Sequence, residues 1–127
     1  MIKKTPKLAF KDDRGEITDL LVKEPVEYVT LITSKKGAVR GNHYHKETVQ
    51  YNYLISGKIE LLTQNEGEKV QSAIMKPGDV TMTPAGERHS LIALEDSVFM
   101  VFTRGPRGGG DYEKDTYRLP VPLKVEA

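Results

Sequence analysis

Turn residues recur in this chain about every ten residues and divide it into short apolar or alternating runs. No stretch keeps an apolar period of 3.6 residues for three turns, so the pattern does not favour helices. Short runs rich in β-branched residues, bounded by Gly, Pro and Asp, are typical of a β-sandwich or barrel. The sequence therefore predicts an all-β fold, with strands over residues 26–33, 39–45, 50–56, 59–63, 70–75, 80–83, 89–94 and 98–102.

A single domain is the expectation for a chain of 127 residues. Residues 26–103 would form the barrel, and residues 104–127 a glycine-rich loop and a C-terminal extension. The net charge of +1 argues against nucleic acid and against an anionic membrane surface as partners. The absence of cysteine excludes disulfides and thiolate ligands. Because no apolar run could span a bilayer or serve as a signal peptide, we expect a cytoplasmic protein.

The three histidines of the chain are the strongest pointer to its function. His43 and His45 are two residues apart in an expected strand, so both side chains point to one face. Together with His89 and with Gln50 they are typical of a metal site. Without an ion, buried imidazoles would need other partners, at about 1–3 kcal/mol for each group left unsatisfied. We therefore predict one divalent ion, and neutral imidazole leaves Zn, Fe, Mn, Ni and Cu all open.

Two segments around these residues resemble the two motifs of the cupin superfamily. The residues that carry the resemblance are Gly37, His43, His45, Gln50 and Gly57 in the first segment, and Gly78, Pro84, Ala85, Gly86 and His89 in the second. The resemblance implies a conical jelly-roll β-barrel (a double-stranded β-helix) with four inward metal ligands, His43, His45, Gln50 and His89. The chain departs from the motifs twice: Gln50 stands where Glu is usual, and Ala93 where Asn is usual.

Gln50 changes the charge of the expected site. A carboxylate would cancel one unit of the metal's charge, whereas an amide oxygen cancels none. We therefore expect weaker metal retention and a more Lewis-acidic ion, suited to polarising a carbonyl or holding an enolate. The alternative is that Gln50 only forms hydrogen bonds inside the barrel, which leaves a metal with three ligands or no metal.

Shorter matches narrow the class of protein. Residues 40–44 resemble the Arg-Gly-x-His-Tyr signature of dTDP-4-dehydrorhamnose 3,5-epimerases, and residues 10–15 are similar to their Phe-x-Asp-x-Arg-Gly element. Residues 40–45 also match the cupin domain of capsular-polysaccharide sugar reductase-epimerases. The set His43, His45, Lys46 and Gln50 resembles a pattern of dTDP-keto-sugar ketoisomerases. These resemblances imply a keto-sugar nucleotide as substrate, in surface-polysaccharide biosynthesis, with proton abstraction next to the keto group.

That chemistry needs a base, an acid and a group that stabilises an enolate. By the same resemblance, His43 is at the position of the base and His89 lies near the matching second histidine. Arg14 and Arg40 match the arginines expected to grip the diphosphate, a task that suits planar guanidinium groups. A metal-bound His43 cannot be a general base, because its lone pair is occupied, and we favour the metal.

The acid and the remaining pocket residues are less defined. Tyr44 is one candidate acid among the tyrosines at positions 44, 51, 53, 112 and 117. Asn52 shares the strand face of Gln50, which predicts a hydrogen-bonding role in the pocket.

The outward faces of the expected sheets predict a homodimer. Tyr51, Tyr53 and Ile55 would point outward, and residues 98–102 are apolar on both faces. This is more apolar surface than one barrel covers, and residues 119–123 could be an arm that crosses to the partner. Whether the protein is an enzyme is left open. The alternatives to an epimerase or isomerase are a metal-dependent dioxygenase or lyase, and a non-catalytic sugar-binding cupin.

Overall fold

The computed structural model describes residues 2–4, 6, 8–106 and 111–125. Within these ranges it has twelve strands and one four-residue helix, α1 (Asp111–Lys114), which confirms the predicted all-β class. The strands are β1 (Ile2–Lys4), β2 (Leu8–Asp12), β3 (Gly15–Thr18), β4 (Tyr28–Ser34), β5 (Val39–Tyr44), β6 (Val49–Ser56), β7 (Ile59–Gln64), β8 (Gln71–Met75), β9 (Val80–Thr83), β10 (Arg88–Ala93), β11 (Ser97–Arg104) and β12 (Tyr117–Arg118). In the described part of the chain, no helix is long and apolar enough to cross a membrane.

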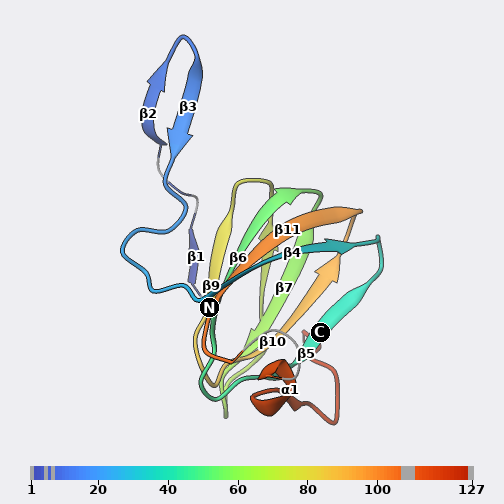
Figure 1. The fold of residues 1–127 in the computed structure, drawn as a ribbon. Coiled ribbons are helices and arrows are strands. Elements are labelled where there is room, and N and C mark those ends of the chain that lie inside the picture. The colour runs from blue at the N-terminus through green and yellow to red at the C-terminus, as the bar shows by residue number, and fades with distance from the viewer. Residues whose placement is uncertain (1, 5, 7, 107–110, 126–127) are drawn as a thin grey trace.

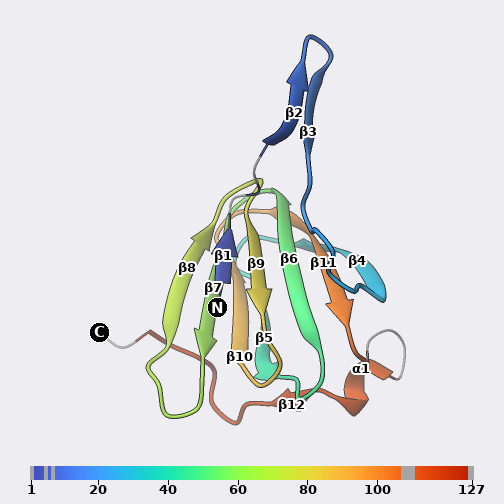
Figure 2. The ribbon, with the colours of Figure 1, turned by 90° about the vertical axis from the view of Figure 1, so that its left-hand side faces the viewer.

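Ten of the strands form two five-stranded sheets that face each other (Figure 1). The first sheet has the order β1-β9-β6-β11-β4, and the second has the order β12-β5-β10-β7-β8. From β4 to β6 and from β9 to β11 the chain changes sheet at every step, which is the arrangement of the predicted jelly roll. The hairpin of β2 and β3 projects from one end of the barrel, whereas α1 and β12 lie along the opposite end (Figures 1 and 2).

Strand β11 shows how the sequence pattern produces the two layers. Its inward residues, Ser97, Phe99, Val101 and Thr103, are buried, and the residues between them are only partly buried. Strand side chains alternate between the two faces of a sheet, so one face of β11 contributes to the barrel interior. The strand is paired with β4 on one side and β6 on the other, in agreement with its apolar character on both faces.

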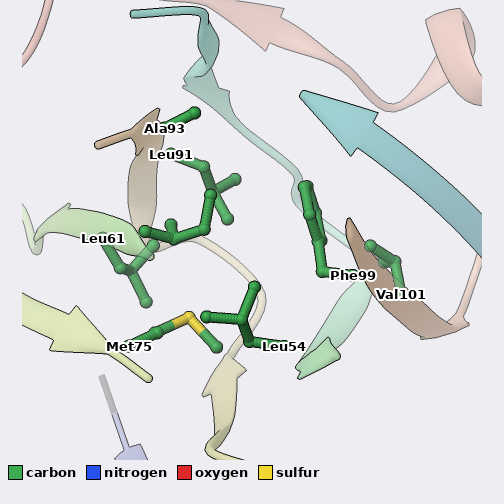
Figure 3. Close-up of a cluster of buried hydrophobic side chains, with 8 residues drawn as sticks. Leu54, Leu61, Met75, Leu91, Ala93, Phe99 and Val101 are labelled. Atoms are coloured by element: carbon green, nitrogen blue, oxygen red, sulfur yellow. The ribbon is translucent and has the colours of Figure 1, made fainter. Parts of the chain in front are cut away.

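The barrel interior is apolar at one end and polar at the other. The apolar end is the core shown in Figure 3, formed by Leu54, Ile59, Leu61, Met75, Leu91, Ala93, Phe99 and Val101. Each of its larger side chains contributes about 1.5–3 kcal/mol on burial. Along β6 the inward residues change from Gln50 and Asn52 to Leu54, and along β10 they change from His89 to Leu91. The histidine site therefore lies directly next to the apolar core.

Elements outside residues 26–103 also contribute to the sheets, which extends the predicted barrel at both ends. β1 pairs with β9, and β12 pairs with β5. The expected apolar strip at 119–123 lies on its own barrel, where Leu119 N donates to Asn42 O (2.8 Å) and Leu123 N donates to Asn42 Oδ1 (2.9 Å). Residues 107–110 of the expected glycine-rich loop lie outside the described residues.

Candidate functional site

The three histidines meet at the polar end of the barrel. His43 is on β5, His45 directly follows that strand, and His89 is on β10 opposite His43. The ring centroids are 4.6 Å apart for His43 and His89, 4.7 Å for His43 and His45, and 5.4 Å for His45 and His89. One nitrogen of each ring lies within 4.8 Å of the others, and all three side chains are buried. The structure thus brings His89 of the second motif beside His45 and His43 of the first, which precede it in the sequence by 44 and 46 positions.

A β-bulge at Asn42 sets the direction of His43. Between β5 and β10, His43 lies opposite His89 and Gly41 lies opposite Ser90, so Asn42 is an extra residue. Gly41 and Asn42 have positive φ angles of 93° and 55°, which Gly and Asn tolerate best. A Cβ on Gly41 would lie 2.9 Å from the carbonyl oxygen of His89. The Gly-Asn pair therefore allows the two histidine-bearing strands to approach closely.

We expect Gly41→Ala to lower the free energy of unfolding by about 2–4 kcal/mol, because it adds a backbone clash to the cost of positive φ. Urea unfolding measures the change. Gly67→Ala is the matched control: Gly67 also has a positive φ (77°), but a Cβ there has no atom within 4 Å. The control should lose only about 1 kcal/mol. Equal losses in the two variants would contradict the close approach at Gly41.

Backbone carbonyls define which nitrogen two of the histidines present to the cluster. His45 Nδ1 lies 2.8 Å from the carbonyl oxygen of Asp115, and His89 Nδ1 lies 3.4 Å from that of Glu87. A carbonyl oxygen only accepts, so in the neutral ring each Nδ1 carries the proton and each Nε2 keeps its lone pair. This is the arrangement in which metal-binding histidines are usually held.

Gln50 reaches the same site from the opposite sheet. It is on β6, its side chain is 5% exposed, and its Nε2 donates to Asn52 Oδ1 at 3.0 Å. With His43 and His89 it lines a cavity of about 390 Å³, whose other lining residues are Ile32, Val39, Arg40, Gly41, Leu91, Phe99 and Arg118. The cavity is large enough for a sugar ring, and it is bordered by the cationic side chains of Arg40 and Arg118.

The residues at this site fit a divalent ion. They offer imidazole nitrogens and an amide oxygen, which are ligands for Zn, Fe, Mn, Ni and Cu. In His45 and His89 the carbonyl contacts keep the proton on Nδ1 and the lone pair on Nε2. Both rings can therefore bind an ion through Nε2 without a change of tautomer. His43, His45, His89 and Gln50 are the residues that would hold the ion.

The two arginines expected to bind substrate lie in different places. Arg40 lines the cavity, and its guanidinium donates to Ser34 Oγ (2.8 Å) and to the carbonyl oxygen of Thr33 (2.9 Å). Arg14 is at the tip of the β2–β3 hairpin, at the far end of the barrel from α1 (Figure 1), and its guanidinium is paired with Asp12 Oδ2 at 2.6 Å. Within one chain, therefore, Arg40 belongs to the site and Arg14 does not reach it.

Tyr44, Tyr51, Tyr53, Tyr117 and Asn52 are not among the residues that line the cavity, and the side chain of Tyr112 lies outside the described part of the structure. Tyr44 alternates away from the two histidines beside it and stacks on Tyr117, with ring centroids 5.2 Å apart. Tyr51 points outward as predicted, and its hydroxyl donates to Glu24 Oε2 at 2.8 Å. Burial and then Glu24 raise the pKa of Tyr51. Asn52 is fully buried behind Gln50.

Sequence reasoning missed two residues of the C-terminal extension that lie beside the histidine site, Asp115 and Arg118. Asp115 is buried, and its carboxylate accepts hydrogen bonds from the backbone N–H groups of residues 46, 47 and 48. Burial acts to raise the pKa of Asp115, but these donors outweigh it and lower the pKa. Arg118 lies opposite His43 in the β12–β5 pair and forms two 2.9 Å contacts with Glu113. No local pattern marks either residue, because each acts on a segment about 70 positions away.

Comparison with known proteins identifies the family. A family model described as a cupin domain matches residues 30–103, which is more than half of the chain. The chain belongs to the cupin family. The matched region contains both segments that carry the histidines, and it corresponds to β4–β11 of the structure. No curated protein matches the chain.

The cupin domain is similar to several solved structures. The rmlC epimerase of Mycobacterium tuberculosis has a TM-score of 0.77 and 19% identity, over 92% of this chain and 67% of that chain. QdtA, a sugar 3,4-ketoisomerase from Thermoanaerobacterium thermosaccharolyticum in complex with TDP, has a TM-score of 0.76 and 17% identity, over 94% and 88%. The capsular polysaccharide assembling protein CapF of Staphylococcus aureus has a TM-score of 0.66 and 23% identity, over 88% and 34%. These likenesses confirm the fold.

Proposed function

We propose that this cupin holds one divalent metal ion and acts as an epimerase or isomerase on a keto-sugar nucleotide in surface-polysaccharide biosynthesis. The observation that carries the proposal is the convergence of three histidine nitrogens within 4.8 Å, next to a cavity lined by His43 and His89 together with Gln50, Arg40 and Arg118. The similarity to an rmlC epimerase and to a ketoisomerase in complex with TDP supports this class of substrate.

The site residues divide into two roles. His43, His45, His89 and Gln50 would hold the ion, which supplies a Lewis acid for a substrate carbonyl when it is bound. Arg40 and Arg118 border the cavity and provide permanent positive charge for the diphosphate. In the described cavity lining, His43 and His89 are the only side chains of a type that serves as a general base. If they hold the ion, the base lies outside this set; if His43 is the base, it does not bind the ion.

The experiment that tests the function is a reaction in D₂O with TDP-4-keto-6-deoxyglucose, followed by mass spectrometry. Deuterium in the recovered sugar nucleotide is the expected result, since proton abstraction next to the keto group exchanges with solvent. A chelator-treated sample then separates the two roles of His43: exchange that survives metal removal shows that proton transfer does not need the ion, as expected if His43 is the base. Oxygen uptake with iron or copper, or saturable sugar binding without exchange, would overturn the proposal.

We also infer that the protein is a homodimer. The outer face of the first sheet exposes Val29 (58%), Leu31 (64%) and Ile55 (43%). Met100 lies between Leu31 and Tyr53 in register, so this apolar face is continuous across β4, β11 and β6. An exposed face of this kind is more often an interface than solvent-covered surface.

The hairpin supports the same inference. Its strands β2 and β3 expose Leu8 (49%), Phe10 (51%) and Ile17 (58%) and project from the barrel (Figures 1 and 2). A lone two-stranded ribbon is marginally stable in water, so it gains most from packing on a second copy.

We expect Leu31→Glu to convert the dimer to a monomer at micromolar concentration, because it places a charge in an apolar interface. Light scattering after size-exclusion chromatography measures the mass. Val121→Glu is the control, since Val121 is 71% exposed but lies on the C-terminal strip, away from this face. A wild-type protein that is already monomeric, or a Leu31→Glu protein that stays dimeric, would contradict the interface.

A further inference from the structure

Four buried side chains form a hydrogen-bonded row that runs from the histidine cavity into the barrel interior. Gln50 Nε2 donates to Asn52 Oδ1 at 3.0 Å, and Asn52 Nδ2 donates to Thr81 Oγ1 at 3.2 Å. Thr81 Oγ1 in turn donates to Met75 Sδ at 3.6 Å, which joins the first sheet to β8 of the second. All four are at most 5% exposed, so bulk water does not compete for these bonds. We call this row the amide relay.

The chemistry of its last member gives the amide relay a direction. A thioether sulfur has no proton and can only accept, so the Thr81 hydroxyl donates its one proton to Met75 Sδ. The Thr81 oxygen must then accept from Asn52, which turns the Asn52 amide so that its Nδ2 faces β9. Asn52 Oδ1 is left to accept from Gln50 Nε2. The remaining polar atom of the Gln50 amide, Oε1, is an acceptor.

The opposite direction forms fewer hydrogen bonds. If Thr81 donated to Asn52 Oδ1, Asn52 Nδ2 would donate to Gln50 Oε1, and Met75 Sδ would lose its partner. The row would then hold two bonds in place of the three that the structure has. Losing a buried hydrogen bond is unfavourable, and a bond to a thioether sulfur, which is a weak acceptor, contributes less than a bond between oxygen and nitrogen atoms. The direction of the row also determines whether Gln50 can bind a cation, because the reversed amide would present N–H donors to the histidines in place of Oε1.

We propose that the amide relay is a positioning device that presents Gln50 Oε1 to the histidine cavity, so that the site selects a cation over an anion. Asn52, Thr81 and Met75 are its positioning residues, and none of them borders the cavity. The inference rests on the proposed metal site for its function, but the orientation of the Gln50 amide can be measured without any metal.

The functional test uses Co²⁺ alone, with affinity and ligand field read from its visible absorption. Met75→Leu keeps the core volume and removes the acceptor at the end of the row. Thr81→Val removes the hydroxyl and keeps the shape. Both variants should bind Co²⁺ roughly tenfold more weakly, with an altered spectrum, as is usual for changes behind a metal ligand. Thr81→Ser keeps the hydroxyl and should stay within about twofold of wild type by the same argument.

A double-variant cycle separates positioning from general damage to the barrel. In a Gln50→Leu background the amide relay has nothing to orient, so Met75→Leu and Thr81→Val should cause no further loss of Co²⁺ affinity. An undiminished tenfold loss in that background would overturn the proposal. So would wild-type affinity in both single variants.

The structural test is NMR of the metal-free protein. The Gln50 side-chain N–H₂ group should exchange slowly with solvent and show a nuclear Overhauser contact to Asn52. Contacts from that group to the ring protons of His43 or His89 would overturn the orientation. A wild-type protein that binds no Co²⁺ but shows the expected amide contacts would refute the metal site and leave the orientation standing, so the two failures are distinguishable.

Discussion

His45→Ala is expected to yield a protein that is purified without metal, where the wild type contains about one equivalent. The variant removes an imidazole whose Nδ1 contacts the backbone carbonyl of Asp115, which leaves Nε2 as the ligand atom. The centroid of this ring lies 4.7 Å from that of His43. Loss of a direct ligand should weaken binding by more than roughly a hundredfold, beyond the range for changes behind a ligand. Elemental analysis of protein prepared without added metal measures the content.

Gln50→Glu should act in the opposite direction and slow metal removal by a chelator about tenfold or more, because a carboxylate adds a negative charge beside the cation. The barrel can accept this change. Asn52 can turn its Nδ2 toward the new carboxylate, and Thr81 can then donate to Asn52 Oδ1 in place of Met75. The substitution therefore leaves no buried donor without an acceptor.

Lys46→Ala is the matched control for both variants. Lys46 follows His45 directly, but its side chain is exposed and lies 4.5 Å from the centre of the Tyr117 ring. Its metal content should equal that of the wild type. Equal metal content in the wild type, His45→Ala and Gln50→Glu would refute the site as described.

Asp115→Ala is expected to lower the free energy of unfolding by about 3 kcal/mol. The Asp115 carboxylate accepts the backbone N–H groups of Lys46, Glu47 and Thr48, each at 2.9 Å, and also the Thr48 hydroxyl at 3.1 Å. Each buried donor that loses its acceptor costs about 1–3 kcal/mol, reduced where water can enter. Urea unfolding of the metal-free protein measures this effect.

The same variant should weaken metal binding by about 10- to 100-fold. The carboxylate fixes the position of residue 115, whose backbone carbonyl in turn orients the His45 ring. Glu113→Ala is the control, since the Glu113–Arg118 pair is mostly exposed and worth at most about 1 kcal/mol. If Asp115→Ala lost no more stability than Glu113→Ala, the carboxylate would not organise the segment after His45. A loss of stability with unchanged metal affinity would limit Asp115 to a structural role.

Much of the fold follows from local chemistry that can be recognised in the sequence. Turn glycines such as Gly57 and Gly78 have the positive φ angles that other residues resist, and they separate strands close to where the pattern predicts them. The period of two places His43 and His45 on one face whatever surrounds them. The hydroxyl of Tyr51, one residue after Gln50, points to the other face for the same reason.

The remaining features depend on segments that meet only in the folded chain. Arg14 belongs to a motif-like element, yet the hairpin that carries it projects away from the histidines of its own chain (Figure 1). The polar C-terminal extension carries no periodic pattern, yet it supplies the carbonyl that orients His45 and the arginine opposite His43. Neither position could be found by counting along the sequence.

The sequence by itself determined the all-β class, the turns and the set of histidines, because backbone preferences and strand alternation act over a few residues. Only the tertiary structure decided which amide atom Gln50 presents to the histidines, through Asn52, Thr81 and Met75. It also decided that Asp115 supports the segment after His45. A hydrogen bond between distant strands depends on sheet register and side-chain direction, which no single segment of the chain specifies.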